Sequence, residues 1–398
     1  MKQLSWGNDG YLDDYEFYNR TDDLNLLINL LDTTQYGSSP LILLTGIRRV
    51  GKTVLIKKLE EKFKDDYLVI YTDLRESNEY QNGTLNRADI IKIFYDNFIK
   101  SLEEKGFSSS IKKIEKFFKT NNIVLKDLLE FKEIPIPIIG KEEDYSKLVN
   151  YIVELPEHVY EENKDEIKGI IIFIDEIQVL KDLGKDLQNF LWYLRSKIQF
   201  QKNVTYLFSG SMSTRDELIS MLSGQEGAFG GRVLNIEIKP FSLDTTKNYL
   251  KEKLPQLKLT EESYETFYEL THGIPFYINL FANLMPKDVK INEIDTLQYF
   301  NEFLPYLVSH YLITWGKLTL REQKIITSLL DEPLSRKIIA KKLNVTQGSL
   351  GRPLNHLMDL VLIEYYENKY RIIDPILKYW LKHVYEEKGL YPYRDSLD

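Results

Sequence analysis

A glycine-containing loop between an apolar run and an amphipathic segment constrains the fold of this chain more than any other feature. The loop, residues 46–53, reads GIRRVGKT and fits the pattern G-x-x-x-x-G-K-[ST]. Residues 41–44 before it are all apolar, as in a buried strand, and residues 54–63 after it carry apolar side chains at helical spacing. A strand, a glycine loop and a helix in this order predict a loop whose backbone N–H groups surround phosphate oxygens.

The residues of this loop and the first residue after it are predicted to bind a nucleotide through its phosphates. They are Gly46, Arg48, Arg49, Val50, Gly51, Lys52, Thr53 and Val54. Lys52 is expected to reach the β- and γ-phosphates of ATP, and the Thr53 hydroxyl to ligate Mg²⁺. The alternative is a glycine turn that matches the pattern by chance, and the two correct flanks argue against it.

Composition narrows the class of protein. The 398 residues suffice for two or three domains, and 43% hydrophobic with 28% charged residues is typical of a soluble globular chain. No apolar run approaches the roughly 18 residues of a membrane span, and MKQLSWGNDG lacks the apolar segment of a signal peptide. We therefore expect no membrane association and a cytoplasmic location. The absence of cysteine excludes disulfides and thiolate metal sites.

Five apolar segments predict an α/β fold with a parallel five-stranded sheet. They are residues 41–44, 67–72, 169–174, 204–208 and 233–238. The second strand should lie parallel to the first, since a helix connects them. It ends in Asp73-Leu-Arg75, whose polar groups should face a ligand crevice. Residues 76–168 are interpreted as a helical insertion, with helices at 87–105, 110–119 and 143–155 and an extended, proline-containing piece at 134–140.

The third predicted strand carries an acidic pair at its end. Asp175 and Glu176 follow the all-apolar run IIIFI, which is a Walker B pattern. Asp175 is expected to hold Mg²⁺ through its waters, and Glu176 to orient and polarise the attacking water. An acidic pair in this place also occurs as a helix cap, but the upstream phosphate loop favours the catalytic interpretation.

Two further positions are candidates for sensing phosphate. Ser209 and Ser211 follow the fourth strand, where a hydroxyl can respond to the γ-phosphate, although the same residues also suit a simple turn. Arg232 follows two glycines and precedes the fifth strand. It fits an arginine finger and a surface ion pair equally well.

The remainder of the chain is expected to form two smaller domains. Residues 1–240 hold the nucleotide-binding core, and residues 241–316 a helical lid with helices at 243–254, 261–271 and 277–285. The break between the last two helices contains Gly273 and Pro275.

Residues 317–398 have the order of a winged helix-turn-helix domain: helices at 320–330, 335–343 and 346–360, then a hairpin of 362–366 and 369–373. Arg336, Lys337, Lys341 and Lys342 give this part a basic patch on a chain of net charge −8. Pro353 would bend the presumed recognition helix. Contact with double-stranded DNA and docking of a protein both remain open.

Several of these segments together resemble the archaeal ATPase family of the STAND class of P-loop NTPases. They are GIRRVGKT at 46–53, IIIFIDEIQ at 170–178, SGS at 209–211, GGRVLNIEIKPF at 230–241, HGIPFY at 272–277 and YRIIDPILKYWL at 370–381. The resemblance implies a switch controlled by ATP, in which the lid and the winged helix move with the core. It also implies that Pro275 touches the adenine and that Arg232 senses phosphate.

The sequence therefore predicts an ATPase, ATP plus water to ADP plus phosphate, with slow turnover and Mg²⁺ as cofactor. Two alternatives remain open: a DNA-binding regulator in which hydrolysis is incidental, and a replication-initiator-like AAA+ protein that self-associates. A partner protein is a further expectation. A GTPase is disfavoured because the base-reading Asn-Lys-x-Asp pattern is absent after the acidic pair.

Overall fold

The computed structural model describes residues 4–6, 12, 17–76, 80, 83, 85–120, 125–126, 136–137, 142–212 and 217–393. The chain divides into two compact units. The sheet unit comprises Arg20–Thr45 and Lys52–Glu237, and the C-terminal unit comprises Met1–Asn19, Gly46–Gly51 and Ile238–Asp398. Most of the predicted phosphate loop therefore packs with the C-terminal unit, although both of its flanks belong to the sheet unit.

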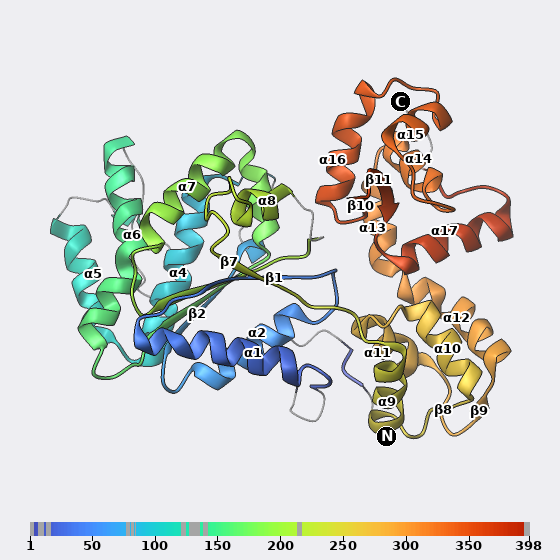
Figure 1. Ribbon diagram of the computed structural model, residues 1–398, viewed down its shortest axis with the longest axis horizontal. Helices are drawn as coiled ribbons and strands as arrows, with labels where there is room; N and C mark the ends of the chain where they lie inside the picture. The colour runs from blue at the N-terminus through green and yellow to red at the C-terminus, as the bar shows by residue number, and fades with distance from the viewer. Residues whose placement is uncertain are drawn as a thin grey trace. The chain divides into compact units, whose positions relative to one another are not determined.

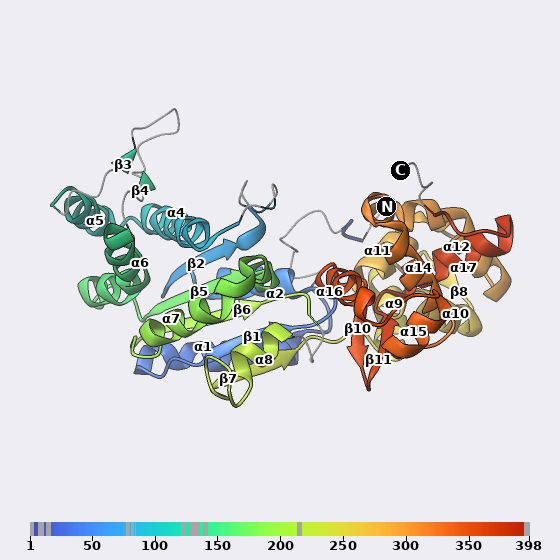
Figure 2. The same ribbon diagram turned by 90° about the horizontal axis from the view of Figure 1, so that it is seen from above.

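The sheet unit is built on five parallel strands, which confirms the predicted α/β class. The strands are β1 (Leu41–Thr45), β2 (Leu68–Asp73), β5 (Ile170–Asp175), β6 (Val204–Ser209) and β7 (Val233–Glu237). Their order across the sheet is β2-β5-β6-β1-β7, which Figure 2 shows from above. The second strand, β2, is parallel to β1 as predicted, but β5 and β6 lie between them. This order brings the carboxyl ends of β5, β6 and β1 next to one another.

Helices cover both faces of this sheet (Figure 1). They are α1 (Thr21–Asp32), α2 (Lys52–Phe63), α4 (Arg87–Lys105), α5 (Ser108–Thr120), α6 (Glu142–Asn163), α7 (Leu187–Ile198) and α8 (Glu217–Ser223), with 3-10 turns at Thr33–Tyr36, Leu74–Glu76 and Ile177–Asp186. Figure 1 shows α1 and α2 on one face and α4, α6 and α7 over the other. Strands β1, β5 and β6 are almost wholly buried because helices cover both of their faces, whereas the edge strand β7 is partly exposed.

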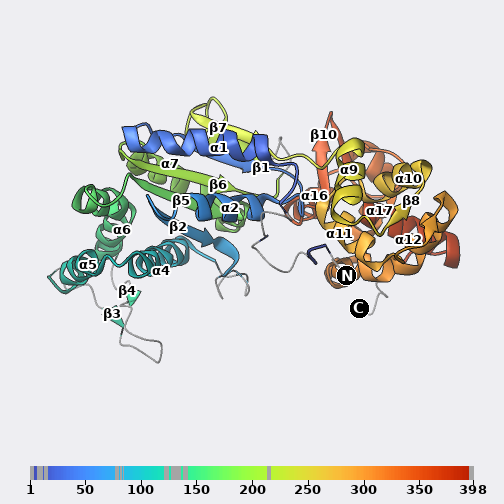
Figure 3. The same cartoon turned by 90° about the horizontal axis from the view of Figure 1, so that it is seen from below.

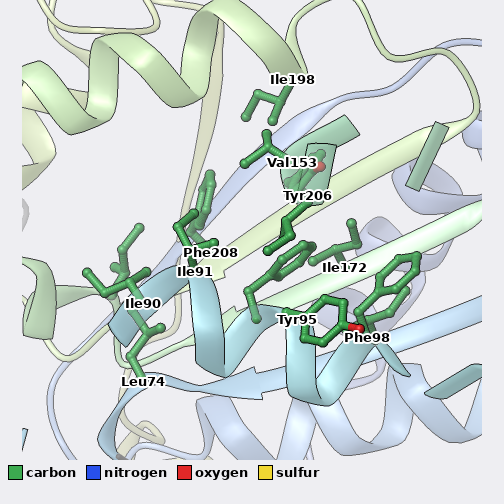
Figure 4. Close-up of a cluster of buried hydrophobic side chains, with 14 of the residues drawn as sticks. Leu74, Ile90, Ile91, Tyr95, Phe98, Val153, Ile172, Ile198, Tyr206 and Phe208 are labelled. Atoms are coloured by element: carbon green, nitrogen blue, oxygen red, sulfur yellow. The ribbon is translucent and has the colours of Figure 1, made fainter. Parts of the chain in front are cut away.

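The region predicted as an insertion contributes directly to the core of the sheet unit. Figure 4 shows Ile91 and Tyr95 of α4 and Val153 of α6 packed among Ile172 and Phe208 of the sheet. Helix α6 continues past the predicted end at residue 155, through Pro156 to Asn163, because buried Val159 packs in the same core. Of the extended piece predicted at 134–140, only β4 (Ile136–Pro137), paired with β3 (Leu125–Lys126), lies within the described residues.

The C-terminal unit is mostly helical, and α9, α10 and α12 pack together in it (Figure 3). Its helices are α9 (Leu243–Lys253), α10 (Glu261–Thr271), α11 (Pro275–Leu284), α12 (Glu293–Leu307), α13 (Ser309–Lys317), α14 (Leu320–Ser328), α15 (Arg336–Lys342), α16 (Gly351–Asp359) and α17 (Pro375–Lys388). Its strands are β8 (Lys258–Leu259), β9 (Lys290–Ile291), β10 (Ile363–Tyr366) and β11 (Lys369–Ile372). One continuous cluster of buried side chains joins the predicted lid to the predicted winged helix. Among the described helices, none has both the length and the apolar composition required to cross a membrane.

The last part of this unit follows the predicted order of three helices and a hairpin. Strands β10 and β11 are antiparallel, and an antiparallel bridge joins Leu334 to Tyr370. The expected bend at Pro353 is wrong, because α16 begins at Gly351 after a 3-10 turn at Gly348–Leu350. Pro353 is then in the first turn, where a helix has no partner for a backbone N–H.

Candidate functional site

The phosphate loop has the backbone that its glycines allow. Gly46 has φ 145°, and a Cβ atom there would lie 2.4 Å from the carbonyl oxygen of Ile238. Gly51 has φ 105°, and Arg49 is left-handed with φ 67°, whereas Val50 between them is not. Alternation of left- and right-handed residues turns successive N–H groups toward one point and forms an anion-binding nest. Helix α2 begins directly afterwards at Lys52 and adds the positive end of its dipole.

The lysine of the loop meets a hydroxyl from the neighbouring strand end. Lys52 is 7% exposed, and its Nζ donates to Oγ of Ser211 over 3.1 Å. Ser211 follows β6, which the strand order places beside β1. Ser209, the last residue of β6, is fully buried, and its Oγ has no hydrogen-bond partner among the described residues. Of the two serines predicted from the sequence, Ser211 is therefore the one beside the lysine.

The predicted magnesium ligands lie together. Thr53 Oγ1 donates to Oδ2 of Asp175 over 2.8 Å, and the backbone N–H of Glu176 donates to Oδ1 over 2.9 Å. Tyr71 on β2 also donates its hydroxyl to Oδ2, over 3.2 Å. Burial raises the pKa of Tyr71, and the charge of Asp175 raises it further, so the hydroxyl stays protonated. A hydroxyl and a carboxylate are oxygen ligands of the kind that Mg²⁺ prefers, and this set fits the ion.

The second acidic residue is held by its neighbours. Glu176 is 8% exposed and left-handed, with φ 58°. Its Oε1 lies 2.9 Å from Nη1 of Arg75, and its Oε2 accepts a hydrogen bond from the Gln178 amide. The same arginine pairs with Asp73 through Nε and Nη2, over 3.2 and 2.9 Å. Burial alone would lower the pKa of Arg75, but these two carboxylates outweigh it and raise the pKa, so the side chain stays cationic.

Arg232 is separated from this cluster along the sheet, and Pro275 belongs to the other unit. Arg232 precedes the first residue of β7, at the amino-terminal edge of the sheet, whereas Asp175 ends β5 at the carboxyl-terminal edge. A strand of this length spans about 16 Å, which separates Arg232 from that edge, and its role as a phosphate-sensing arginine stays a prediction. A role toward a second subunit stays a prediction. Pro275 is the first residue of α11 in the C-terminal unit, and its contact with adenine also stays a prediction.

Sequence reasoning did not assign roles to Tyr71, Arg75 and Gln178. The polar ending Asp73-Leu-Arg75 was a signal that something at this strand end faces the ligand crevice. Tyr71 gives no such signal, because a tyrosine inside an apolar strand is normally a core residue. Gln178 is identified as part of the site only from its contacts in the structure. Its Oε1 accepts a hydrogen bond from the N–H of Ser211 over 3.2 Å.

The predicted basic patch of the C-terminal unit is partly engaged within the unit. Arg336 donates through Nε to the carbonyl of Gln347 over 2.7 Å, and Lys342 Nζ lies 3.3 Å from the carbonyl of Ser328. Lys337 and Lys341 are exposed. The structure thus assigns Arg336 a role in holding the turn before α16, and leaves the two exposed lysines as the simpler candidates for phosphate contacts.

The fold and the cluster define a class. A parallel sheet with a glycine loop after β1, a helix N-terminus at Lys52 and an acidic pair at the end of β5 is a P-loop nucleotide-binding arrangement. Residues 17–281 match the family described as an ATPase domain predominantly from Archaea, and the chain belongs to that family.

Two relatives are named only as uncharacterized ATP-binding proteins. One, from Methanocaldococcus jannaschii, is 23% identical over 359 residues, covering 85% of this chain and 89% of the relative. The other, from Pyrococcus abyssi, is 25% identical over 273 residues, covering 66% of this chain and 70% of the relative.

Two solved structures resemble the whole chain. A Walker-type ATPase of Pyrococcus abyssi has a TM-score of 0.61 at 20% identity, covering 95% of this chain and 99% of its own. The ORC2 protein of Aeropyrum pernix, solved in ADPNP–ADP complexes, has a TM-score of 0.50 at 12% identity, covering 94% and 95%. At these identities the likeness concerns the fold alone.

Proposed function

We propose that this protein binds and slowly hydrolyses Mg·ATP, and that it works as a nucleotide-dependent switch. The observation that carries the proposal is the cluster at the carboxyl ends of β5 and β6. There Thr53 meets Asp175 over 2.8 Å, Lys52 meets Ser211 over 3.1 Å, and Glu176 is adjacent in the chain to Asp175. Family membership and relatives named as ATP-binding proteins support ATP as the nucleotide.

Each residue of the cluster has a task that its chemistry suits. The loop N–H groups and Lys52 bind the phosphates, and Lys52 exchanges the Ser211 hydroxyl for phosphate oxygens. Thr53 and Asp175 would hold Mg²⁺, and the bound ion would supply positive charge that neutralises the phosphates. Glu176 accepts a hydrogen bond from the attacking water and orients it toward the γ-phosphorus. Arg75 and Gln178 occupy both carboxylate oxygens of Glu176, so one of them must give way before a water can bind there, and this supports slow turnover.

Two substitutions test the proposal. Lys52→Ala should abolish nucleotide binding, because it removes the buried ammonium beside the loop. Glu176→Gln should bind ATP with unchanged affinity and lose hydrolysis, because an amide cannot accept the water proton. Binding is measured by titration calorimetry and turnover by phosphate release. Normal turnover in Glu176→Gln would refute the catalytic role of Glu176. Normal nucleotide binding in Lys52→Ala would refute the proposed nucleotide site.

A second candidate activity is contact with double-stranded DNA through residues 317–393, which we propose form a winged helix. The order of α14, α15 and α16 followed by the β10–β11 hairpin supports this assignment. The exposed ammonium groups of Lys337 and Lys341 supply charge for phosphate contacts.

Duplex binding measured at 50 and 200 mM salt tests this second activity. The double variant Lys337→Ala, Lys341→Ala should weaken the complex. The slope of the logarithm of the binding constant against the logarithm of salt concentration should become less steep by about 2, since each lysine neutralises one phosphate. Absence of binding at low salt would remove the DNA assignment. The mass in solution with ATP, measured in parallel, tests self-association.

A further inference from the structure

The phosphate loop contains a non-glycine residue in a conformation that disfavours side chains. Arg49 has φ 67°, and the loop needs this left-handed residue because it precedes Val50 and the left-handed Gly51 in the alternating nest. An L-residue with a Cβ atom is unfavourable there, since the Cβ crowds the following carbonyl oxygen. Some other interaction of Arg49 must offset this cost if the loop is to stay in the shape that binds phosphate.

The Arg49 side chain makes several contacts within the C-terminal unit. Its Nη1 donates to the hydroxyl oxygen of Tyr277 over 3.1 Å. Its guanidinium lies 5.0 Å from the ring centroid of Phe276, 5.7 Å from that of Tyr277 and 5.8 Å from that of Tyr311. All three distances are within the range of a cation–π interaction. Three aromatic rings and one hydrogen bond therefore fix the end of this arginine.

The hydrogen bond continues to a buried carboxylate. Tyr277 is fully buried, and its hydroxyl donates to Oδ2 of Asp374 over 2.7 Å. Burial raises the pKa of Tyr277, and the charge of Asp374 raises it further, so the hydroxyl remains a donor. Oδ1 of Asp374 accepts the N–H groups of Ile376 and Leu377 and caps α17. Asp374 thus connects the tyrosine to the start of α17.

We propose that Arg49 is a positioning residue for nucleotide binding, and we call Arg49, Tyr277 and Asp374 the Arg49 latch. The latch offsets the unfavourable left-handed backbone of Arg49 and so holds the phosphate loop in its anion-binding shape before the ligand arrives. This inference rests on the proposed function, since it concerns the affinity of the same loop. The competing explanation is that the charge of Arg49 attracts the phosphates directly.

Substitutions at Arg49 separate strain from charge. Arg49→Ala loses the latch and keeps the left-handed Cβ, so ADP affinity should fall about tenfold. Arg49→Gly also loses the latch, but glycine has no Cβ atom and adopts the left-handed backbone without cost. Its ADP affinity should therefore lie between those of the wild type and Arg49→Ala. Under direct attraction of phosphate, Arg49→Gly and Arg49→Ala would bind equally weakly, and Arg49→Lys would bind like the wild type. Either of those two results would overturn the latch.

Substitutions outside the loop test the latch without changing the charge near the phosphates. Tyr277→Phe removes only the hydroxyl that joins Arg49 to Asp374, and should weaken ADP binding about fivefold. Asp374→Asn keeps a side chain that can cap α17, and should weaken binding to a similar extent. Wild-type affinity in both variants would overturn the proposal.

Arg371→Ala is the matched control. Arg371 also lies over a tyrosine ring, 4.3 Å from the centroid of Tyr366, and pairs with Glu364 on the hairpin of the same unit. Its loss should leave ADP affinity within about twofold of the wild type, because no loop conformation depends on it. If this control weakens binding as much as Arg49→Ala does, a general loosening of the unit explains the data and the latch is refuted.

Hydrogen exchange supplies a readout that does not depend on turnover. Because coupling between binding and the latch is reciprocal, ADP should slow amide exchange in α11 and in the first turn of α17 of the wild type. The same protection should be lost in Arg49→Ala at saturating ADP, and its persistence there would overturn the proposal. If the wild type binds no nucleotide, the proposed function fails. If the wild type binds and the variants bind equally well, only the latch fails.

Discussion

Removal of Arg75 should accelerate basal ATP hydrolysis, because Arg75 binds a carboxylate oxygen of Glu176, the residue proposed to orient the attacking water. Nη1 lies 2.9 Å from Oε1 of Glu176, and the Gln178 amide takes the other carboxylate oxygen. Glu176 can accept a hydrogen bond from water only after one of these donors leaves. Arg75→Ala removes one of them permanently.

The structure sets the size of this effect. Glu176 is nearly buried, but the Arg75 side chain is 42% exposed, so solvent weakens the pair. A charge-assisted hydrogen bond discounted for this exposure is worth about 1–2 kcal/mol, which corresponds to a rate increase of roughly 5- to 30-fold. We expect this increase in kcat at saturating Mg·ATP, with little change in ATP affinity.

Phosphate release in single and double variants tests the reasoning. Arg75→Ala combined with Glu176→Gln should be as inactive as Glu176→Gln alone, since the gain passes through Glu176. Arg87→Ala is the control, because it removes an exposed ion pair of 3.9 Å with Asp186 in the same unit. A lower kcat in Arg75→Ala would refute the inhibitory role and make the arginine a contributor to catalysis.

Three further predictions follow from single contacts. Tyr71→Phe should raise the Mg²⁺ concentration needed for ATP binding about three- to tenfold while leaving binding in EDTA unchanged, because Asp175 loses one of the donors that fix it; equal Mg²⁺ requirements would contradict this. Gly46→Ala should reduce nucleotide affinity by more than about 100-fold, since its Cβ would lie 2.4 Å from a carbonyl oxygen; Gly106→Ala, left-handed but with open space at its Cβ, should bind normally. Burial lowers the pKa of His272, so the unfolded chain binds more protons than the folded chain below about pH 6.5. The free energy of unfolding therefore decreases as the pH is lowered through this range. His272→Asn, which tolerates φ 50°, should flatten urea midpoints between pH 5 and 7.5, and an unchanged pH slope would show that another group is responsible.

Local sequence patterns were sufficient to predict the site residues that directly follow a strand. The apolar run before Asp175 and the pattern around Lys52 each predicted a strand end, and parallel strands bring such ends to one edge. The pairing of Thr53 with Asp175 was therefore predictable before the structure was known. The place of β2 at the sheet edge beside β5 was not, because no local pattern states it. The patterns also did not decide that Ser211, rather than Ser209, meets Lys52.

The contacts that fix the side chains of the site could not be predicted from the sequence, for a physical reason. Arg75 and Glu176 are a hundred residues apart, and each is locally an ordinary charged residue at a strand end. The role of Arg232 stays a prediction for a related reason, because two glycines before a strand do not show which edge of the sheet the arginine lies on. Only the direction of β7 settles that question.

The paired arginines of the loop now have different interpretations. Arg48 is exposed, whereas the guanidinium of Arg49 is fixed by aromatic rings and by Tyr277. Gly51 packs with the C-terminal unit and Lys52 begins α2 of the sheet unit, so one peptide bond inside the phosphate loop joins the two units. A ligand shifts a conformational equilibrium only by its difference in affinity for the two states. A nucleotide that binds the loop only when Arg49 is left-handed would favour the latched state of the C-terminal unit by that same difference, and would therefore act on α11 and α17 through Arg49.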